Sequence, residues 1–199
     1  MISRVQISLP SYIFVFIGNN DNMVQTKLIE DEGCKLCPLH ITRNNIVWYR
    51  GTATENVHIL FIGEAPGKEE DLTGKPFVGR AGLILDRWIK EAELTNYAII
   101  NIVKCRPPMN RKPTIAEIRA CTPHLIKQIN DMKPKMIVAL GAVPSSVLIN
   151  RKEVIANIGK IFQSRYGMVI VFPHPSFILR GMKAYVPIKE LKEISKKLM

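Results

Sequence analysis

Four cysteines in this chain have the spacing of a metal site. Two form a C-x2-C pair, and the other two follow 67 residues later with 15 residues between them; they are Cys34, Cys37, Cys105 and Cys121. Thiolates are soft ligands that favour zinc or an iron–sulfur cluster, and ligand type alone does not separate the two. A C-x2-C loop is a poor structural disulfide, and four unrelated core thiols would rarely show this pairing. We therefore expect one metal site built from both pairs.

A segment rich in glycine and carboxylates runs from Gly63 to Asp71, with the sequence G-E-A-P-G-K-E-E-D. Its glycines and proline allow a tight turn close to a ligand. The four carboxylates could form a solvated acidic turn, or one of them could face a buried pocket and orient water or stabilise positive charge. Phosphate binding is disfavoured because the carboxylates would repel phosphate and no G-x4-G-K-[ST] pattern is present.

Two other segments carry side chains suited to a planar ligand. Phe77 lies in the glycine-rich loop T-G-K-P-F-V-G-R-A-G, where it could pack in the core or stack on a base. His174 lies between two prolines that restrict its backbone. A lone histidine is more often structural, but a neutral one here could donate a hydrogen bond to a developing anion. Ser176 could contact a phosphate.

Composition indicates a single basic globular domain. The chain has 199 residues, 47% of them hydrophobic, a net charge of +11 and an isoelectric point near 9.6. This length accommodates one sizeable core. The charge favours an anionic partner, and nucleic acid is the leading candidate. The loop Arg106–Pro113 adds local positive charge from Arg106, Arg111 and Lys112, and a metal site at the flanking cysteines would hold that loop rigid against phosphates.

The first residues of the chain are expected to be peripheral. The apolar segment Tyr12–Gly18 is too short to span a bilayer, and no small-residue cleavage site follows it. We interpret residues 1–22 as an N-terminal extension and residues 23–199 as one domain. The protein is expected in the cytoplasm, with no membrane partner.

Alternating strand and helix patterns predict an α/β fold. Continuous apolar runs predict strands at 57–62, 97–103, 136–140 and 168–172, and amphipathic patterns predict helices at 81–93, 114–131, 144–149 and 187–198. Thr114 and Glu117 form a capping box at the start of the second helix. We expect a three-layer α/β/α sandwich with a mostly parallel four-stranded sheet. Glu64, Asn101 and His174 would then meet at the carboxyl ends of the strands, where such sheets bind ligands.

Taken together, these motifs resemble the family 4 uracil-DNA glycosylases, the iron–sulfur group of the uracil-DNA glycosylase superfamily. The resemblance covers about Cys34 to Arg180 and rests on the four cysteines and on G-E-A-P-G-x-E-E-D, G-K-P-F-V-G-R-A-G, N-I-V-K-C-R-P-P and H-P-S in the expected order. It implies an α/β/α sandwich and a 4Fe–4S cluster with a structural role, held by Cys34, Cys37, Cys105 and Cys121.

The resemblance also implies roles for individual residues. Phe77 would stack on a flipped uracil, Asn101 would read its O4 and N3–H edge, and His174 would bond O2 and stabilise the leaving anion. Glu64 and Ala65 would lie beside the glycosidic bond, with Glu70 as a nearby acid. From the residues themselves we also expect DNA contacts by Arg106, Arg111, Lys112, Ser176 and Arg180, and the wedge that enters the helix would be Phe177, Leu179 or Arg180.

The implied activity is that of a monofunctional glycosylase in base excision repair, which releases uracil from single- or double-stranded DNA and leaves an abasic site. We expect a monomer, with a sliding clamp or other repair proteins as candidate partners. The alternatives are a non-catalytic nucleic-acid-binding module stapled by metal, and a zinc protein acting on nucleotides.

Overall fold

The computed structural model describes residues 31–181 and 184–198. The predicted extension, residues 1–22, lies outside them, as do residues 23–30 of the predicted domain. Within the described ranges the strands form one six-stranded mixed sheet in the order β1-β3-β2-β4-β6-β5. The strands are β1 (Arg50–Gly51), β2 (Ile59–Gly63), β3 (Tyr97–Asn101), β4 (Met136–Leu140), β5 (Ile161–Ser164) and β6 (Gly167–Phe172).

The four predicted strands are the four parallel strands of this sheet. β3, β2, β4 and β6 pair in parallel, and β1 and β5 add antiparallel edges. The α/β class is confirmed, whereas the prediction of a four-stranded sheet was wrong. β1 has only two residues, and β5 alternates exposed and half-buried positions. Neither edge strand has the continuous apolar run that marks a strand buried on both faces.

The four predicted helices are present, each within two residues of the predicted bounds. In the described part of the chain the helices are α1 (Lys68–Thr73), α2 (Arg80–Glu91), α3 (Ile115–Met132), α4 (Ala142–Ile149), α5 (Val154–Asn157), α6 (Pro175–Leu179) and α7 (Ile188–Leu198), with 3-10 turns η1 (Pro38–Ile41) and η2 (Pro108–Asn110). The capping box is confirmed, because Glu117 N–H donates to Thr114 Oγ1 at 3.2 Å and Thr114 N–H donates to Glu117 Oε2 at 2.7 Å.

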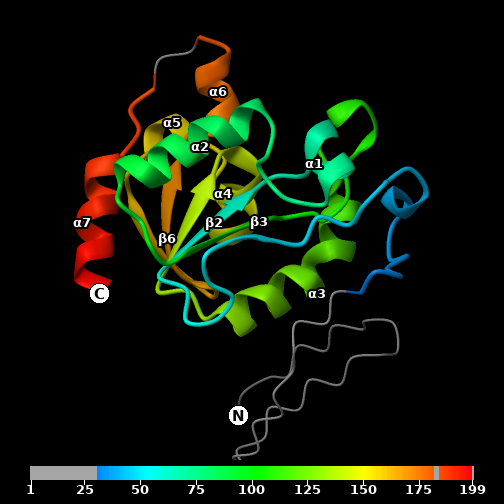
Figure 1. Ribbon diagram of the computed structural model, residues 1–199, viewed down its shortest axis with the longest axis horizontal. Coiled ribbons are helices and arrows are strands. Elements are labelled where there is room, and N and C mark those ends of the chain that lie inside the picture. The colour runs from blue at the N-terminus through cyan, green and yellow to red at the C-terminus, as the bar shows by residue number, and fades with distance from the viewer. Residues whose placement is uncertain (1–30, 182–183, 199) are drawn as a thin grey trace, which may run out of the picture.

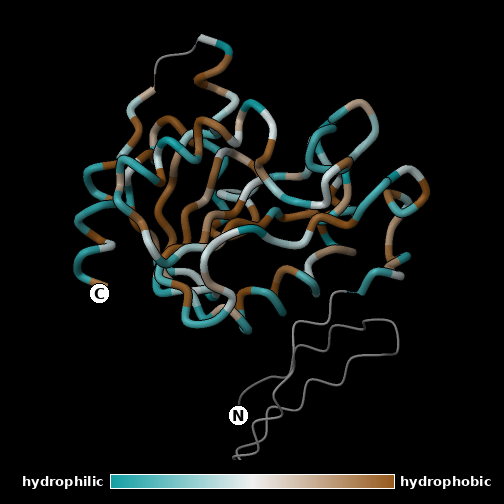
Figure 2. The backbone as a smooth tube through the Cα atoms, in the orientation of Figure 1, coloured by the Kyte–Doolittle hydropathy of each residue, from teal (hydrophilic) through white to brown (hydrophobic). Residues whose placement is uncertain are grey.

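The core lies in two layers, one on each face of the sheet. Along β2, Leu60 and Ile62 pack toward α3 and α4, whereas Ile59 and Phe61 pack toward α2 and α7. Figure 1 shows the sheet between these helices, and Figure 2 shows apolar strands inside a more polar helical shell. The predicted three-layer sandwich is therefore correct. No helix among the described residues is long and apolar enough to cross a membrane.

The chain reverses its direction of winding next to β2. From β2 it passes to β3 on one side and then crosses to β4 on the other, so the loops that leave β2 and β4 diverge. Gly63 at the end of β2 pairs with Asn101 at the end of β3. Crevices at such points bind ligands in open α/β sheets.

Candidate active site

A cleft of about 1150 Å³ opens at this edge of the sheet. Its walls come from the loops that follow the four parallel strands and from residues 152–156. Most of the predicted site residues line it: Glu64, Ala65, Glu70, Phe77, Asn101, Arg111, Lys112, His174, Ser176 and Arg180. Arg106 does not line the cleft, and its Nε–H donates instead to Asn110 Oδ1 at 2.7 Å.

The Asn101 side chain lies at the floor of the cleft without hydrogen-bond partners. It is 1% exposed, and within the described residues neither its Nδ2 nor its Oδ1 makes a hydrogen bond. An unpaired buried amide costs about 1–3 kcal/mol, so protein interiors rarely leave one. A ligand with one acceptor beside one donor would satisfy both atoms.

Phe77 and Asn101 converge over Gly63. A Cβ placed on Gly63 would clash with Asn101 Oδ1 and would lie 2.5 Å from Phe77 Cε2. The Phe77 ring centroid lies 5.8 Å from that of His174, with 36° between the rings. The amide, the benzyl ring and the imidazole therefore surround one small space.

The backbone of Phe77 adopts an unfavourable conformation that neighbouring groups stabilise. Its φ is +55°, a value rare for aromatic residues. Arg50 donates to the carbonyls of Pro76 and Phe77 at 3.0 Å each and pairs with Asp86 at 2.7 Å. Gly82 allows α2 to begin against the Phe77 carbonyl, since a Cβ there would clash with it. These contacts fix the ring before any ligand arrives.

Two of the predicted carboxylates hold loops. Glu70 accepts hydrogen bonds from the backbone N–H groups of Gly67, Val78 and Gly79 at 2.9–3.0 Å, so it ties α1 to the Phe77 loop. Asp71 is buried and accepts from Asn44. Neither pattern resembles a solvated acidic turn.

Glu64 is the carboxylate best placed for chemistry. It is half-buried in the cleft wall. Burial raises its pKa above the usual value for a glutamic acid, and the charge of Lys112 opposes this rise. Arg111, expected to bind DNA, forms a bidentate ion pair with Glu117 at 2.6 and 2.8 Å. This contact holds the pKa of Glu117 down at about 2.

His174 presents a neutral imidazole to the cleft. Burial, with a smaller effect from the charge of Arg180, lowers its pKa to about 4. Its Nδ1 accepts from the Ser176 backbone N–H at 3.1 Å, and Ser176 Oγ lies 2.8 Å from the same atom. Because Nδ1 is the acceptor, the proton resides on Nε2, which is free to donate to a ligand. Gly141 permits this approach, since its Cβ would lie 2.9 Å from that of His174.

This depressed pKa predicts a loss of stability in mild acid. The unfolded chain protonates His174 near pH 6.5 and the folded chain only near pH 4, so lowering the pH between these values favours unfolding by up to about 3 kcal/mol. In His174→Leu the difference in urea midpoint between pH 7.5 and 4.5 should shrink. Burial also lowers the pKa of His124, so some pH dependence should remain. An unchanged difference would contradict the assignment.

The four cysteines line one small second cavity. All four are free thiols. Burial raises the pKa of Cys105 to about 11 and also raises that of Cys121, so these sulfurs stay protonated unless a metal displaces the protons. Within the described residues no three of the four sulfurs lie within 4.8 Å of one another. A tetrahedral zinc site, with Zn–S bonds of about 2.3 Å, needs a closer set.

A buried lysine connects this cavity to the cleft. Lys104 is 1% exposed, and its Nζ donates to the Asn101 carbonyl. Its backbone N–H donates to Cys121 Sγ at 3.3 Å. Burial lowers the pKa of Lys104 to about 8. The cysteine cavity therefore lies directly behind the wall that carries Asn101.

Sequence reasoning missed several residues of the cleft. Lys68, Arg80 and Lys152 add positive charge to its walls. Arg80 and Lys68 each follow a glycine at the start of a helix, which could have drawn attention to them. No sequence signal distinguishes residues 152–156, because they form a wall only through the fold.

Comparison with known proteins gives a consistent result. The family model described as the uracil DNA glycosylase superfamily matches residues 51–197. A type-4 uracil-DNA glycosylase of Thermotoga maritima is 41% identical over 170 residues, covering 82% of this chain and 86% of that protein. Another from Pyrobaculum aerophilum is 38% identical, covering 75% of this chain and 81% of its own. One from Saccharolobus solfataricus is 41% identical and covers 76% of each.

The family model spans the cleft, and the identities extend over most of the chain. The predicted family is confirmed: the chain belongs to the uracil-DNA glycosylase superfamily, and within it to the type-4 uracil-DNA glycosylases.

Proposed function

We propose that this protein removes uracil from DNA by hydrolysing its N-glycosidic bond, which leaves free uracil and an abasic site. Family membership makes it a hydrolase of N-glycosyl bonds. The observation that carries the proposal for this chain is the unpaired amide of Asn101 beside the rings of Phe77 and His174. Uracil presents O4 as an acceptor next to N3–H as a donor, so its edge fits that amide. Cytosine would place an amino group against Nδ2 and lose the match.

Binding begins with phosphate contacts and base flipping. Basic residues on the walls, including Lys112, Arg180 and Arg80, suit the DNA backbone. Arg106, Arg111 and Ser176 remain candidates for such contacts, and Phe177, Leu179 or Arg180 would fill the space left in the helix. Extruding the nucleotide costs a few kcal/mol, least for a mispaired base. Stacking on Phe77 and pairing with Asn101 offset this cost.

Bond cleavage then depends on charge. The neutral His174 donates from Nε2 to uracil O2, where negative charge develops as the base leaves. Glu64 lies next to Ala65, on the other side of the glycosidic bond from His174. Its carboxylate stabilises the positive charge that develops on the sugar and orients the attacking water. Glu70 acts by holding the Phe77 loop rather than by touching substrate. Since no Schiff base is required, the enzyme leaves the strand intact.

The cysteine cavity fits a 4Fe–4S cluster better than zinc because all four cysteines line it, yet no three of their sulfurs lie within 4.8 Å of one another. Cys34, Cys37, Cys105 and Cys121 would hold it, and its contribution is to cross-link the wall behind Asn101. The proposal further includes one domain over residues 23–199, a monomer, a cytoplasmic location, and a sliding clamp or other repair proteins as partners.

The direct test uses a labelled oligonucleotide with one uracil, paired with guanine or single-stranded. The expected result is a break at uracil only after heating in alkali, together with release of the free base. A folded sample that carries its metal but leaves the uracil strand unbroken would favour the non-catalytic nucleic-acid-binding module. A break before alkali treatment would contradict the monofunctional mechanism.

Phe77→Ala should weaken excision through lost stacking, by about 1–3 kcal/mol or roughly 5- to 150-fold in kcat/KM. The rate of Phe77→Leu should fall between those of the parent protein and Phe77→Ala, since leucine retains part of the apolar area. Single-turnover rates on the same oligonucleotide provide the measurement. Wild-type rates in both variants would rule out a stacking role for this ring.

A further inference from the structure

Three of the four cysteine sulfurs have an N–H group within hydrogen-bond distance. His124 Nε2 lies 3.3 Å from Cys34 Sγ, and Arg43 Nη1 lies 3.6 Å from Cys105 Sγ. The backbone N–H of Lys104 donates to Cys121 Sγ at 3.3 Å. One of these groups belongs to the backbone and is fixed by the fold, and the other two belong to side chains.

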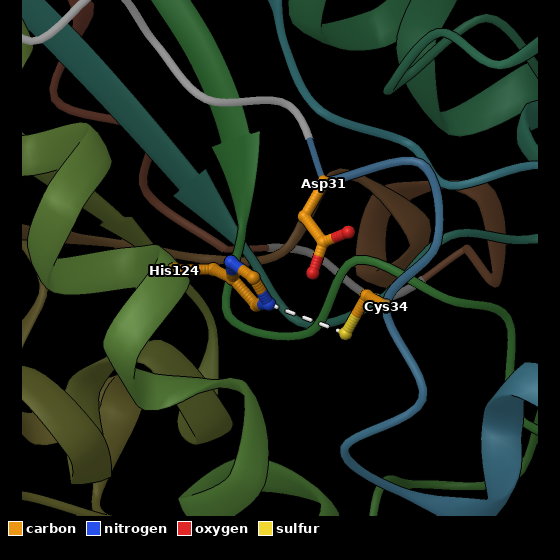
Figure 3. Close-up of side chains that lie close together, drawn as sticks. All are labelled: Asp31, Cys34 and His124. Carbon is orange, nitrogen blue, oxygen red and sulfur yellow. Dashed lines mark hydrogen bonds between the residues drawn. The ribbon is translucent and has the colours of Figure 1, made fainter. Parts of the chain in front are cut away.

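The two side-chain donors are held in place by other contacts. Trp48 packs edge-on against the His124 ring at 5.2 Å and 72°. Arg43 also donates from Nη1 to the Cys34 carbonyl at 2.7 Å and from Nη2 to the Glu32 carbonyl at 3.4 Å. Arg43 therefore joins the first cysteine pair to Cys105, and its charge lies next to the sulfurs. Figure 3 shows His124 directed at Cys34 from α3.

Free thiols need no such arrangement, because a neutral S–H is a weak acceptor. Metal-bound thiolates carry negative charge, and hydrogen bonds to them shift that charge toward the protein. In iron–sulfur sites these bonds help to set the reduction potential, and outer-shell groups of this kind hold the ligands in orientation. The N–H groups at Cys34, Cys105 and Cys121 thus match thiolates better than thiols.

We infer that His124 and Arg43 are outer-shell donors to the cluster thiolates, which raise the cluster's reduction potential and slow its loss. The inference rests on the cofactor assigned under the proposed function. Its physical basis is that reduction adds one electron to an already anionic centre, so donors and a nearby cation stabilise the reduced form more. They also hold the thiolates in the orientation that binds iron, which slows its loss.

Asp31 supports a competing arrangement. Its carboxylate, Cys34 Sγ and His124 lie within 4.8 Å of one another, which is close enough for one divalent ion (Figure 3). Asp31 Oδ1, however, accepts from the Gly33 N–H at 3.1 Å. The group also draws on only one of the four cysteines. Zinc held by these three residues is the outcome that the experiment must separate from the cluster.

The test uses the full chain purified anaerobically, with iron content, absorbance near 400 nm and an electrode titration. His124→Phe and Arg43→Met should each shift the midpoint potential to a more negative value. In air with EDTA they should shorten the half-life of the absorbance several-fold. His124→Gln and Arg43→Lys, which retain a donor or the cation, should lie closer to the parent protein.

His58→Phe and Arg87→Met are matched controls that lie outside both cavities, and they should behave as the parent. If a folded Phe or Met variant takes up no iron while its Gln or Lys counterpart does, the proposal is also supported. Unchanged potentials and half-lives in folded variants would overturn it. So would a colourless parent protein that binds zinc and loses it in Asp31→Asn. Uracil release, measured in parallel, tests the proposed function separately from these results.

Discussion

Replacing Asn101 with leucine should abolish uracil excision while leaving the protein at least as stable as before. The reason is that the buried amide has no partner among the described residues, so removing it relieves a cost of about 1–3 kcal/mol. The same change removes both hydrogen bonds to uracil, and sites built on such bonds discriminate steeply. We expect kcat/KM to fall by more than about 100-fold, with an equal or higher melting temperature.

Asn101→Asp separates the hydrogen-bond pattern from the size of the side chain. The carboxylate would face uracil O4 without a donor, so excision should again fall by more than about 100-fold. Asn130→Asp, an exposed change on α3, controls for added charge and should keep the parent rate. Single-turnover cleavage and thermal melts provide both readouts. Normal uracil excision by either Asn101 variant would refute the assigned pocket.

Gly63→Ala should cost nearly as much activity, although it adds one methyl group to a residue that makes no polar contact with the base. Its Cβ would meet both Asn101 Oδ1 and the Phe77 ring, so one of them must move. Displacing a substrate-positioning group by about 1 Å can cost about 100-fold in rate. Overpacking of this kind also destabilises by about 1–3 kcal/mol.

Gly33→Ala is a suitable comparison, because its Cβ would make only an ordinary contact at 3.5 Å. It should retain the parent rate and melting temperature. In Gly63→Ala, the loss should appear in kcat/KM for uracil DNA, while affinity for undamaged DNA stays near the parent value. Full excision by a folded Gly63→Ala protein would show that Phe77 and Asn101 do not meet over this glycine.

The central strands and longer helices could be predicted because their patterns are local. β2, β3, β4 and β6 are continuous apolar runs, and α3 has its capping box. The missed elements were short or lacked a pattern: α1 and α6 have six and five residues, and β5 is partly exposed. Such segments acquire their structure from neighbours distant in the sequence.

The site residues likewise include some that could be predicted from the sequence and some that could not. The roles of Phe77, Asn101 and His174 could be named because the chain resembles a family, whereas the strand pattern alone placed only Asn101 and His174, at strand ends. The roles of Glu70 and Arg50 could not be foreseen, because they depend on contacts with residues 8 to 36 positions away. The net charge likewise could not predict that Arg111 pairs with Glu117.

The position of Arg50 on β1 limits how rigidly the Phe77 ring is held. This strand, with only two residues, is the smallest in the sheet and lies at its edge, where pairing opens most readily. The Arg50 guanidinium donates to the Phe77 carbonyl, so each opening of β1 at the edge of the sheet removes this support from the Phe77 loop. The Thr52 N–H donates to the Tyr97 carbonyl next to β1, so hydrogen exchange at this amide reports how often the uracil pocket opens in the absence of DNA.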